Sequence, residues 1–503
     1  MDSWLKSALA YVPGWLDLQM RHSRQPGCIV AIAHNGRIVL QQAFGSADLQ
    51  AAEPLTPRHR FRVASHSKSF TAAGIMLLRE WKKLRLDDEV GSYVPGVHPR
   101  VARTTLTQLL SHSAGIVRDG PDAGQFTAQR PFLNRDELLA DLQAPPAIEP
   151  NTRFKYSNHG FGLLGLVIEA TTGTPYPDWI MRNVIAPAGL KETTPDMPLR
   201  EATPFARGHT AYWLGGQRLT VPGDESAHAI GPAAGFVSTA ADLVRFFAQL
   251  DPGAPRSPLS VTSRREMIRP QWRNPHASVE VHYGLGVMSG RLNRWDWFGH
   301  SGSFLGYISR TAVLPRRNLA VAVLTNAVDG WAGVWLEGIF HILRTFADRG
   351  APARGVSGWT GRWWSPWGAV DLVPMGEVAL AANPHQLNPF LDVAEIAVTG
   401  RDTGLLALAN GYGSHHEPVR RERDASGQVA AVWLGGSMLR PEAQVTADMT
   451  RRYAPKKAPA RRAASDVPQA VSTTGENRYE TGDAPIAHPV IVPARRLHRK
   501  PDA

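Results

Sequence analysis

Two short apolar runs near the start of the chain predict a pair of strands. They cover residues 28–33 and 38–43, and Asn35-Gly36 lies between them. Asn-Gly is the preferred pair for a two-residue type I′ turn, because both positions take positive φ. We therefore expect a β-hairpin. Cys28 is the single cysteine and opens the first run, so we expect a buried thiol and no intramolecular disulfide.

Apolar residues at helical spacing predict the next elements. Residues 65–81 carry a stripe of this kind, with Ser65 at or near the N-cap. Further helices are expected at residues 138–142, 160–170 and 240–250, the last behind the capping pair Ser238-Thr239.

Strand patterns return after about residue 280. Residues 307–314 and 319–326 flank Pro315-Arg316-Arg317-Asn318 and predict a second hairpin, and residues 331–346 predict an apolar helix. The order of strands, helix, helical insert, strands and helix predicts an α/β (α+β) fold with an antiparallel sheet flanked by helices.

Composition changes twice along the chain and predicts three parts. A segment rich in Gly, Ala, Pro and Arg at 347–358 is followed by short β-like runs up to about residue 439. We expect a main domain at 1–350, a small all-β, barrel-like domain at 351–450, and a basic, Pro-rich disordered tail at 451–503.

The charge is concentrated in the predicted tail. The chain has 55 Lys and Arg against 44 Asp and Glu, a net charge of +11, and residues 451–503 hold 11 against 5. The folded body therefore gives no reason to expect nucleic-acid binding. No run approaches the ~18 apolar residues of a membrane span. Asp2, Pro13, Gly14 and Asp17 interrupt the first segment, so we recognise no signal peptide and expect a cytoplasmic location.

Several familiar motifs are absent or misleading. Residues 160–165 match G-x-G-x-x-G, but no strand is predicted before them, so helix packing is the preferred interpretation. Neither His-Glu-x-x-His nor the G-x-S-x-G elbow occurs. We expect no cofactor and no metal.

A serine and a lysine three positions apart give the first chemical signal. Ser65 and Lys68 share one face of the predicted helix. Serine needs a base to become a nucleophile, and a lysine can serve where burial lowers its pKa. The pattern alone does not identify a site, because Ser3-Trp4-Leu5-Lys6 also matches it. The alternative is a capping serine with a surface lysine.

Two further motifs follow in a definite order. Tyr156-Ser157-Asn158 is the only Tyr-x-Asn in the chain, and His300-Ser301-Gly302 is followed by Ser303 and an apolar segment. This order resembles the serine β-lactamase and penicillin-recognising family, which includes DD-peptidases, class C β-lactamases, D-aminopeptidases and related esterases. The likeness covers roughly residues 15–345 and extends to residues 109–116, 235–240, 283–286 and 299–306. The β domain is similar to the extra barrels of D-aminopeptidase-like members.

The resemblance implies a role for each motif. Ser65 would be the acylated nucleophile, Lys68 its base, and Tyr156 the relay that passes the proton to the leaving group. Asn158 would hydrogen-bond Lys68 and the substrate amide. The oxyanion hole would be formed by the N–H groups of Ser65 and Ser303, and the third motif would supply His300 as a catalytic residue, with Ser301 and Gly302 binding substrate.

The third motif departs from the family pattern. No Lys-Thr-Gly occurs, and His300 is largely neutral near pH 7, so recognition of a free carboxylate through this motif should be weaker. The His-x-Gly form resembles the D-aminopeptidase and esterase branches. A structural hydrogen bond is the alternative for His300. Similarly, Trp359, Trp363, Trp364 and Trp367 either form the core of the β domain or line the cleft near Ser65.

We therefore expect a serine hydrolase that forms an acyl-enzyme on Ser65 and cleaves small amides or esters. The alternative is a non-catalytic ligand-binding or sensor protein on a penicillin-binding fold. The expected partner is a small-molecule amide, peptide or ester; no nucleic acid is required, no membrane span is expected, and a homo-oligomer remains open.

Overall fold

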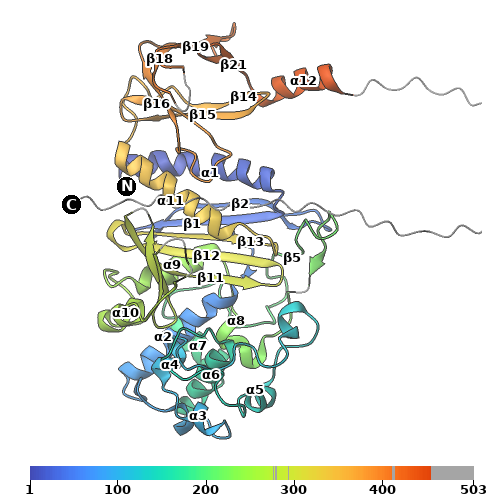
Figure 1. Cartoon of the computed structure of the whole chain (residues 1–503), viewed down its shortest axis with the longest axis vertical. Coiled ribbons are helices and arrows are strands. Elements are labelled where there is room, and N and C mark those ends of the chain that lie inside the picture. Colours follow the sequence, from blue (N-terminus) through green and yellow to red (C-terminus); the bar gives the residue numbers. More distant parts are fainter. Residues whose placement is uncertain (222, 276, 278–279, 293, 410–413, 455–503) are drawn as a thin grey trace, which may run out of the picture. The chain divides into compact units, whose positions relative to one another are not determined.

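An antiparallel sheet forms the centre of the molecule. The computed structural model describes residues 1–454 except 222, 276, 278–279, 293 and 410–413. Within these residues, nine strands pair in the order β3-β2-β1-β13-β12-β11-β10-β9-β8 (Figure 1). They are β1 (Gly27–His34), β2 (Arg37–Asp48), β3 (Glu53–Pro54), β8 (Trp272–Arg273), β9 (Glu280–Tyr283), β10 (Met288–Leu292), β11 (Trp295–Phe304), β12 (Tyr307–Leu314) and β13 (Leu319–Thr325). Because β1 pairs with β13, the two ends of the main domain meet inside one sheet.

Both predicted hairpins are confirmed. Asn35 and Gly36 have φ of 50° and 73°, as a type I′ turn requires, and they connect β1 to β2. Strand β12 pairs with β13 across the turn that ends at Asn318, which also has positive φ. The Cys28 thiol is buried in β1, as expected.

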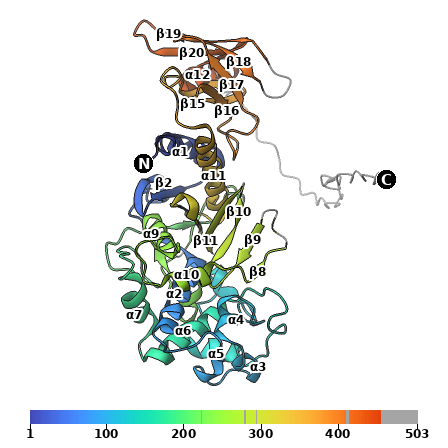
Figure 2. The ribbon, with the colours of Figure 1, turned by 90° about the vertical axis from the view of Figure 1, so that its left-hand side faces the viewer.

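Helices cover both faces of the sheet. Side chains alternate along each strand, so Val30 and Val323 face α1 (Ser3–Ser23) and α11 (Ala332–Arg349), whereas Ile29 and Leu324 face α2 (Ser67–Glu80) and α9 (Ala240–Leu250) (Figures 1 and 2). Helix α1 was not expected from the sequence. Pro13 and Gly14 lie inside this helix, and its apolar face is nevertheless buried against the sheet.

The helical insert follows α2, as expected. Its helices are α3 (Pro99–Ala102), α4 (Leu106–Leu110), α5 (Arg135–Asp141), α6 (Asn158–Thr172), α7 (Tyr176–Ile180) and α8 (Gly231–Ala234), with α10 (Val261–Ile268) following α9. The Thr239 hydroxyl accepts a hydrogen bond from the Asp242 N–H at 3.2 Å and caps α9, which confirms the predicted cap. The G-x-G-x-x-G stretch lies in α6, where a Cβ at Gly165 would come within 2.3 Å of Pro232, so helix packing explains its glycines.

A second sheet of eight described strands follows residue 360. The strands are β14 (Gly361–Ser365), β15 (Gly368–Met375), β16 (Val378–Ala382), β17 (Ala394–Val398), β18 (Thr403–Leu408), β19 (Pro418–Arg423), β20 (Val429–Leu434) and β21 (Ser437–Leu439). A bridge between Trp364 and Arg440 joins the two edge strands, so the sheet is barrel-like. Trp359 and Trp363 are buried in its core, whereas Trp367 is 98% exposed.

The second sheet contacts α1, on the face of the central sheet opposite α2. Asp371 on β15 accepts a hydrogen bond from the Tyr11 hydroxyl at 2.9 Å and pairs with Arg362, whose Nη1 donates to the Gly14 carbonyl at 3.0 Å. Of the four tryptophans, Trp359 and Trp363 are buried in the core of the second sheet, which was one of the two roles expected for them.

The predicted division into three parts stays a prediction. Residues Met1–Asp448 form one compact unit. Helix α12 (Glu442–Tyr453) includes the first residues of the predicted tail, and residues 455–503 lie outside the described residues. In the part of the chain that the structure describes, no helix has the length and apolarity to cross a membrane. The cytoplasmic location also stays a prediction.

Candidate active site

Ser65 lies in a tight turn between a short strand and α2. Strand β4 (Phe61–Arg62) pairs with β7 (Val237–Ser238), and a 3₁₀ turn at Ala64–His66 follows. Ala64 has φ of 46°, a conformation uncommon for residues with a side chain. The α-helix itself begins at Ser67, two residues later than predicted, and His66 is its N-cap residue.

The neighbouring His66 anchors this turn. The His66 ring is fully buried, with Nδ1 2.9 Å from the Val63 carbonyl and Nε2 3.0 Å from the Thr311 hydroxyl on β12. Burial lowers the pKa of His66 to about 3, so the ring is neutral near pH 7. The turn that carries Ser65 is thus tied to the central sheet.

The Ser65 hydroxyl has two polar neighbours. Lys68 Nζ lies 3.2 Å from Ser65 Oγ, and the Tyr156 hydroxyl donates a hydrogen bond to the same oxygen at 2.8 Å. Lys68 comes from the first turn of α2, and Tyr156 precedes α6 by two residues. The fold therefore brings the first two sequence motifs together at one oxygen atom.

Lys68 is fully buried, and its amine has two fixed acceptors. Nζ donates to Asn158 Oδ1 at 2.7 Å and to the Ala233 carbonyl at 2.9 Å. Burial lowers the pKa of Lys68 well below its ordinary value, and this outweighs the opposing charge of Asp119. A neutral amine has two N–H donors and one lone pair. In its neutral form Lys68 would use both donors on these two acceptors, and its lone pair would be left for the Ser65 hydroxyl.

The orientation of Asn158 is set by a residue that the sequence analysis missed. Asn158 Nδ2 donates to Asp119 Oδ1 at 2.6 Å. A carboxylate only accepts hydrogen bonds, so the amide nitrogen must face Asp119 and the amide oxygen must face Lys68. Asp119 lies in a loop of the insert, and no sequence motif pointed to it.

Tyr156 is held by His112, which belongs to the segment at 109–116. The His112 ring lies 4.2 Å from the Tyr156 ring, centroid to centroid. On either side of Tyr156, the Lys155 N–H donates to the His112 carbonyl at 2.8 Å and the Ser157 N–H donates to His112 Nδ1 at 3.1 Å. Burial raises the pKa of Tyr156, so its phenol is protonated at neutral pH.

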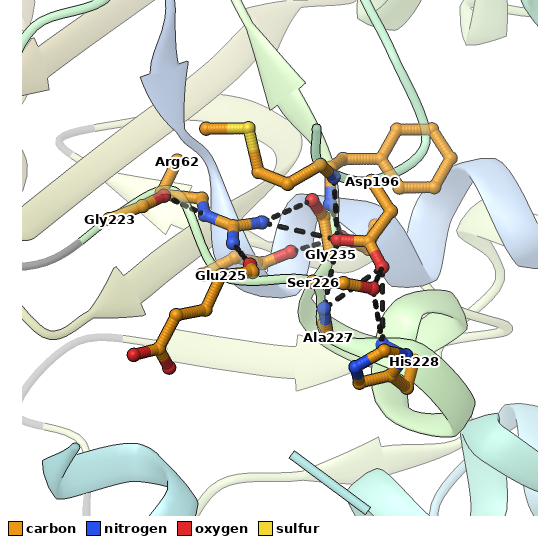
Figure 3. A network of polar contacts seen from close by, with 12 residues as sticks. Arg62, Asp196, Gly223, Glu225, Ser226, Ala227, His228 and Gly235 are labelled. Carbon is orange, nitrogen blue, oxygen red and sulfur yellow. Dashed lines mark hydrogen bonds and ion pairs between the residues drawn. The ribbon is translucent and has the colours of Figure 1, made fainter. Parts of the chain in front are cut away.

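A buried ion pair holds the segments on both sides of α8, the helix that carries the Ala233 carbonyl. Arg62 has no exposed side-chain surface and lies 3.3 Å from Asp196; it also donates to the carbonyls of Gly223 and Gly235, each at 2.8 Å (Figure 3). Asp196 in turn accepts hydrogen bonds from the backbone of Ala227 and His228 and from the Ser226 hydroxyl. These contacts lie on both sides of α8 in the sequence. They hold the helix whose carbonyl contacts Lys68.

The third motif lies on β11 beside the Ser65 turn. A Cβ at Gly302 would come within 2.1 Å of the Val63 carbonyl, so only glycine allows this close approach. Strand β10 pairs with β11 only up to Gly299, so no strand that the structure describes covers this edge beyond it. Ser303 is exposed there.

The Ser301 side chain faces away from Ser65. Its hydroxyl contacts Met288 Sδ at 3.7 Å, and Met288 packs against the core on the α1 side of the sheet. Ser301 can therefore reach a substrate at Ser65 only through its backbone.

His300 is buried, with 2% of its surface exposed. Its Nε2 lies 3.1 Å from the Tyr283 hydroxyl, and its Nδ1 lies 2.7 Å from the Ser301 carbonyl. Burial lowers the pKa of His300 well below its ordinary value, and the ring is neutral at pH 7. Among the described residues, no hydrogen bond joins His300 to Ser65, Lys68 or Tyr156. This geometry matches the structural alternative for His300. Tyr283 belongs to the segment 283–286 in which the sequence resembles the family, but no role for its hydroxyl was predicted from the sequence.

A serine hydroxyl with a buried lysine amine and a tyrosine hydroxyl beside it, next to a strand of an antiparallel sheet, is an arrangement that a known family can be tested against. A family model described as Beta-lactamase matches residues 14–333. The match covers more than half of the chain, and the chain therefore belongs to the Beta-lactamase family. This confirms the resemblance inferred from the motifs.

Two curated relatives match parts of the chain. Penicillin-binding protein 4* of Bacillus subtilis (strain 168) is 34% identical over 190 residues, which are 36% of this chain and 40% of that protein. Protein flp of Staphylococcus aureus (strain MW2) is 27% identical over 328 residues, which are 62% of this chain and 61% of that protein. The chain thus spans less than two thirds of the length of these relatives.

Solved structures share the fold. The octameric penicillin-binding protein homologue from Pyrococcus abyssi has a TM-score of 0.59 at 21% identity, covering 86% of this chain and 99% of that chain. A D-stereospecific amidohydrolase from Streptomyces sp. has a TM-score of 0.55 at 25% identity, covering 66% of this chain and 97% of that chain. These likenesses confirm the predicted fold class.

Proposed function

We propose that this protein is a serine hydrolase that cleaves small amides or esters through an acyl-enzyme on Ser65. One observation carries the proposal: Ser65 Oγ lies within hydrogen-bond distance of both the amine of a fully buried lysine and the hydroxyl of a partly buried tyrosine. A serine that is only structural has no need of a desolvated amine beside it. Membership of the Beta-lactamase family supports the same conclusion.

Acylation moves one proton along this cluster. The neutral Lys68 amine takes the proton of Ser65 as Oγ bonds to the substrate carbonyl carbon, and the carbonyl electron pair moves to oxygen. Tyr156 gives its phenol proton to the leaving nitrogen or oxygen as the carbon–heteroatom bond breaks, and the Lys68 ammonium, which holds the former Ser65 proton, restores the phenol. Water then attacks the acyl carbonyl carbon, one of its protons passes through the same groups to Ser65 Oγ as the ester bond breaks, and the acid is released.

Two backbone N–H groups are proposed to hold the oxyanion. Ser65 lies in the 3₁₀ turn, and Ser303 lies on the uncovered edge of β11 beside it. Gly302 lets the strand approach the turn closely enough for both groups to face one oxygen. The role proposed for His300 is to position Tyr283 and the third motif, because its ring is buried.

The proposal also extends to the class of substrate. The absence of a Lys-Thr-Gly motif and the burial of His300 favour an amidase, D-aminopeptidase-like peptidase or esterase over a β-lactamase. The amidohydrolase among the structural neighbours supports an amide substrate. Comparing turnover of a D-alanine anilide with turnover of a p-nitrophenyl acyl ester separates these activities.

The test is covalent labelling with a fluorophosphonate, followed by peptide mass spectrometry. We expect one adduct, on the peptide that contains Ser65, and none in Ser65→Ala. Ser3→Ala is the matched control, because Ser3 begins the other Ser-x-x-Lys of the chain and is exposed. Lys68→Ala should slow acylation by several orders of magnitude.

A folded protein that gives no adduct and turns over neither substrate contradicts the proposal. The non-catalytic binding protein on the same fold then becomes the better hypothesis. A Lys68→Ala variant with only a twofold loss contradicts the assignment of Lys68 as the base.

A further inference from the structure

Arg118 is an exposed cationic neighbour of Tyr156, and the proposed reaction does not use it. Its side chain is 63% exposed, and its guanidinium carbon lies 5.3 Å from the centre of the Tyr156 ring. Phe154 is also partly exposed, with its ring 6.3 Å from that of Tyr156. A substrate that approaches Ser65 past Tyr156 thus meets one cationic and one aromatic side chain.

Arg118 is held in place both at its backbone and at its side chain. The Arg118 carbonyl accepts a hydrogen bond from the Asn158 N–H at 2.9 Å, which fixes the Arg118 backbone at the start of α6. At the other end, Arg118 Nε forms an ion pair with Asp119 Oδ2 at 3.0 Å. The other oxygen of Asp119 accepts from Asn158. Arg118 is therefore connected to the amide that holds Lys68.

The terminal NH₂ groups of Arg118 are left for a ligand. Only Nε faces Asp119, and the two NH₂ groups hydrogen-bond to none of the residues that the structure describes. Both oxygens of Asp119, by contrast, already face a donor. A guanidinium presents parallel N–H groups that match the two oxygens of a carboxylate.

The other groups of the cluster offer no comparable charge. Burial lowers the pKa of His112 and of His300, so both rings are neutral at pH 7. Burial raises the pKa of Tyr156 and of Tyr283, so both phenols are protonated. Recognition of an anion cannot come from these side chains.

We propose that Arg118 is a specificity-determining residue that binds an anionic group of the substrate, a carboxylate, through its terminal NH₂ groups. The inference rests on the proposed function, because it concerns the substrate of the same site. Arg118 belongs to the helical insert. It would bind the carboxylate that the buried His300 of the third motif cannot bind. The carboxylate lies either on the acyl chain or on the leaving group.

The test compares esters that differ only in one charge. For the acyl side, the pair is the mono-p-nitrophenyl ester of glutaric acid and its methyl ester. For the leaving-group side, the pair is the acetate ester of 3-hydroxybenzoic acid and that of methyl 3-hydroxybenzoate. The variants are Arg118→Gln and Arg118→Lys, with Arg58→Gln as the control, because Arg58 is 77% exposed and pairs with Glu192 away from this cluster.

We expect the wild-type protein to prefer the anionic member of one pair. Arg118→Gln should lower kcat/KM for that ester by about tenfold, mainly through KM, relative to its neutral partner. Any effect on Tyr156 alters both members of a pair and cancels in their ratio. Arg118→Lys should keep part of the preference, and added salt should weaken it. The ester pair whose anionic member loses kcat/KM in Arg118→Gln shows whether the carboxylate lies on the acyl chain or on the leaving group.

Two results would overturn the inference, and they are distinguishable. Turnover that requires Ser65, with the same anionic-to-neutral ratio in Arg118→Gln and wild type, contradicts the role of Arg118 and leaves the proposed function intact. No turnover of any of the four esters, with no acyl group on Ser65 by mass, contradicts the proposed function and this inference with it.

Discussion

Asp119 accepts a hydrogen bond from Asn158 Nδ2 at 2.6 Å, and this contact decides which end of the Asn158 amide faces Lys68. The amide oxygen then lies 2.7 Å from Lys68 Nζ and takes one of its two N–H groups. A residue that does not touch Ser65 thus helps to direct the amine lone pair toward it.

Asp119→Asn should lower kcat/KM about tenfold, because an amide at residue 119 can present either end and no longer fixes Asn158. The pH profile should move as well. The Asp119 charge raises the pKa of Lys68, so its removal lowers that pKa further. The neutral amine then persists to lower pH, and the acid limb of kcat/KM shifts to lower pH. Asp122→Asn in the same loop is the control. If the acid limb of kcat/KM stayed at the wild-type pH in Asp119→Asn, the effect of the Asp119 charge on Lys68 would be contradicted.

Gly302→Ala should displace β11 from the Ser65 turn. The new Cβ would lie 2.1 Å from the Val63 carbonyl, a backbone atom that cannot rotate away. We expect a loss of about a hundredfold in kcat/KM and of about 2 kcal/mol in the free energy of unfolding. Gly333→Ala on α11 is the matched control, because nothing lies within 4 Å of its added Cβ. If Gly302→Ala and Gly333→Ala lowered kcat/KM and the free energy of unfolding equally, the close approach of Gly302 to Val63 could not be the cause.

Asp196→Ala should leave the Arg62 guanidinium buried without a counter-charge. Removing one partner of a buried ion pair costs about 3 kcal/mol, and here it also frees the backbone donors on the N-terminal side of α8. Urea unfolding measures the loss. Asp224→Ala removes a carboxylate that is 63% exposed and pairs with Arg207, and it should change stability by less than about 0.5 kcal/mol. A comparable loss in both variants would show that burial of the pair is unimportant.

Stability should fall as the pH is lowered from about 6.5 toward 3. In the unfolded chain a histidine has a pKa of about 6.5, whereas burial lowers the pKa of folded His66 to about 3. Between these values the unfolded state binds the extra proton, so each such histidine removes up to about 1.4 kcal/mol per pH unit. Burial also lowers the pKa of His112 and His300, which adds to the same trend.

Urea unfolding at pH 7 and pH 5 checks this pH dependence. His66→Gln should reduce the difference in unfolding free energy between the two pH values. His416→Asn, which changes an exposed histidine, should leave the difference unchanged. A wild-type stability that is the same at both pH values would show that these rings take up protons without unfolding.

Local patterns in the sequence were enough to predict several elements. Asn35-Gly36 specified a turn because its backbone angles suit those residues, and Thr239 specified the start of α9 because its hydroxyl caps the first turn. The three motifs also indicated Ser65, Lys68 and Tyr156, since their residue types and order are unusual together. The α1 helix was missed, because Pro13 and Gly14 weaken a helix locally and only burial against the sheet compensates.

The tertiary structure alone decided the surroundings of those residues. Asp119 and Asp196 act through partners far away in the sequence, and the Ala233 acceptor is a backbone carbonyl, which leaves no trace in residue identity. The direction of Ser301 depends on which side of β11 faces α2, and that follows from strand pairing. The sequence thus determined which groups could react, and folding determined their pKa values and orientations, because both depend on burial and on contacts between distant segments.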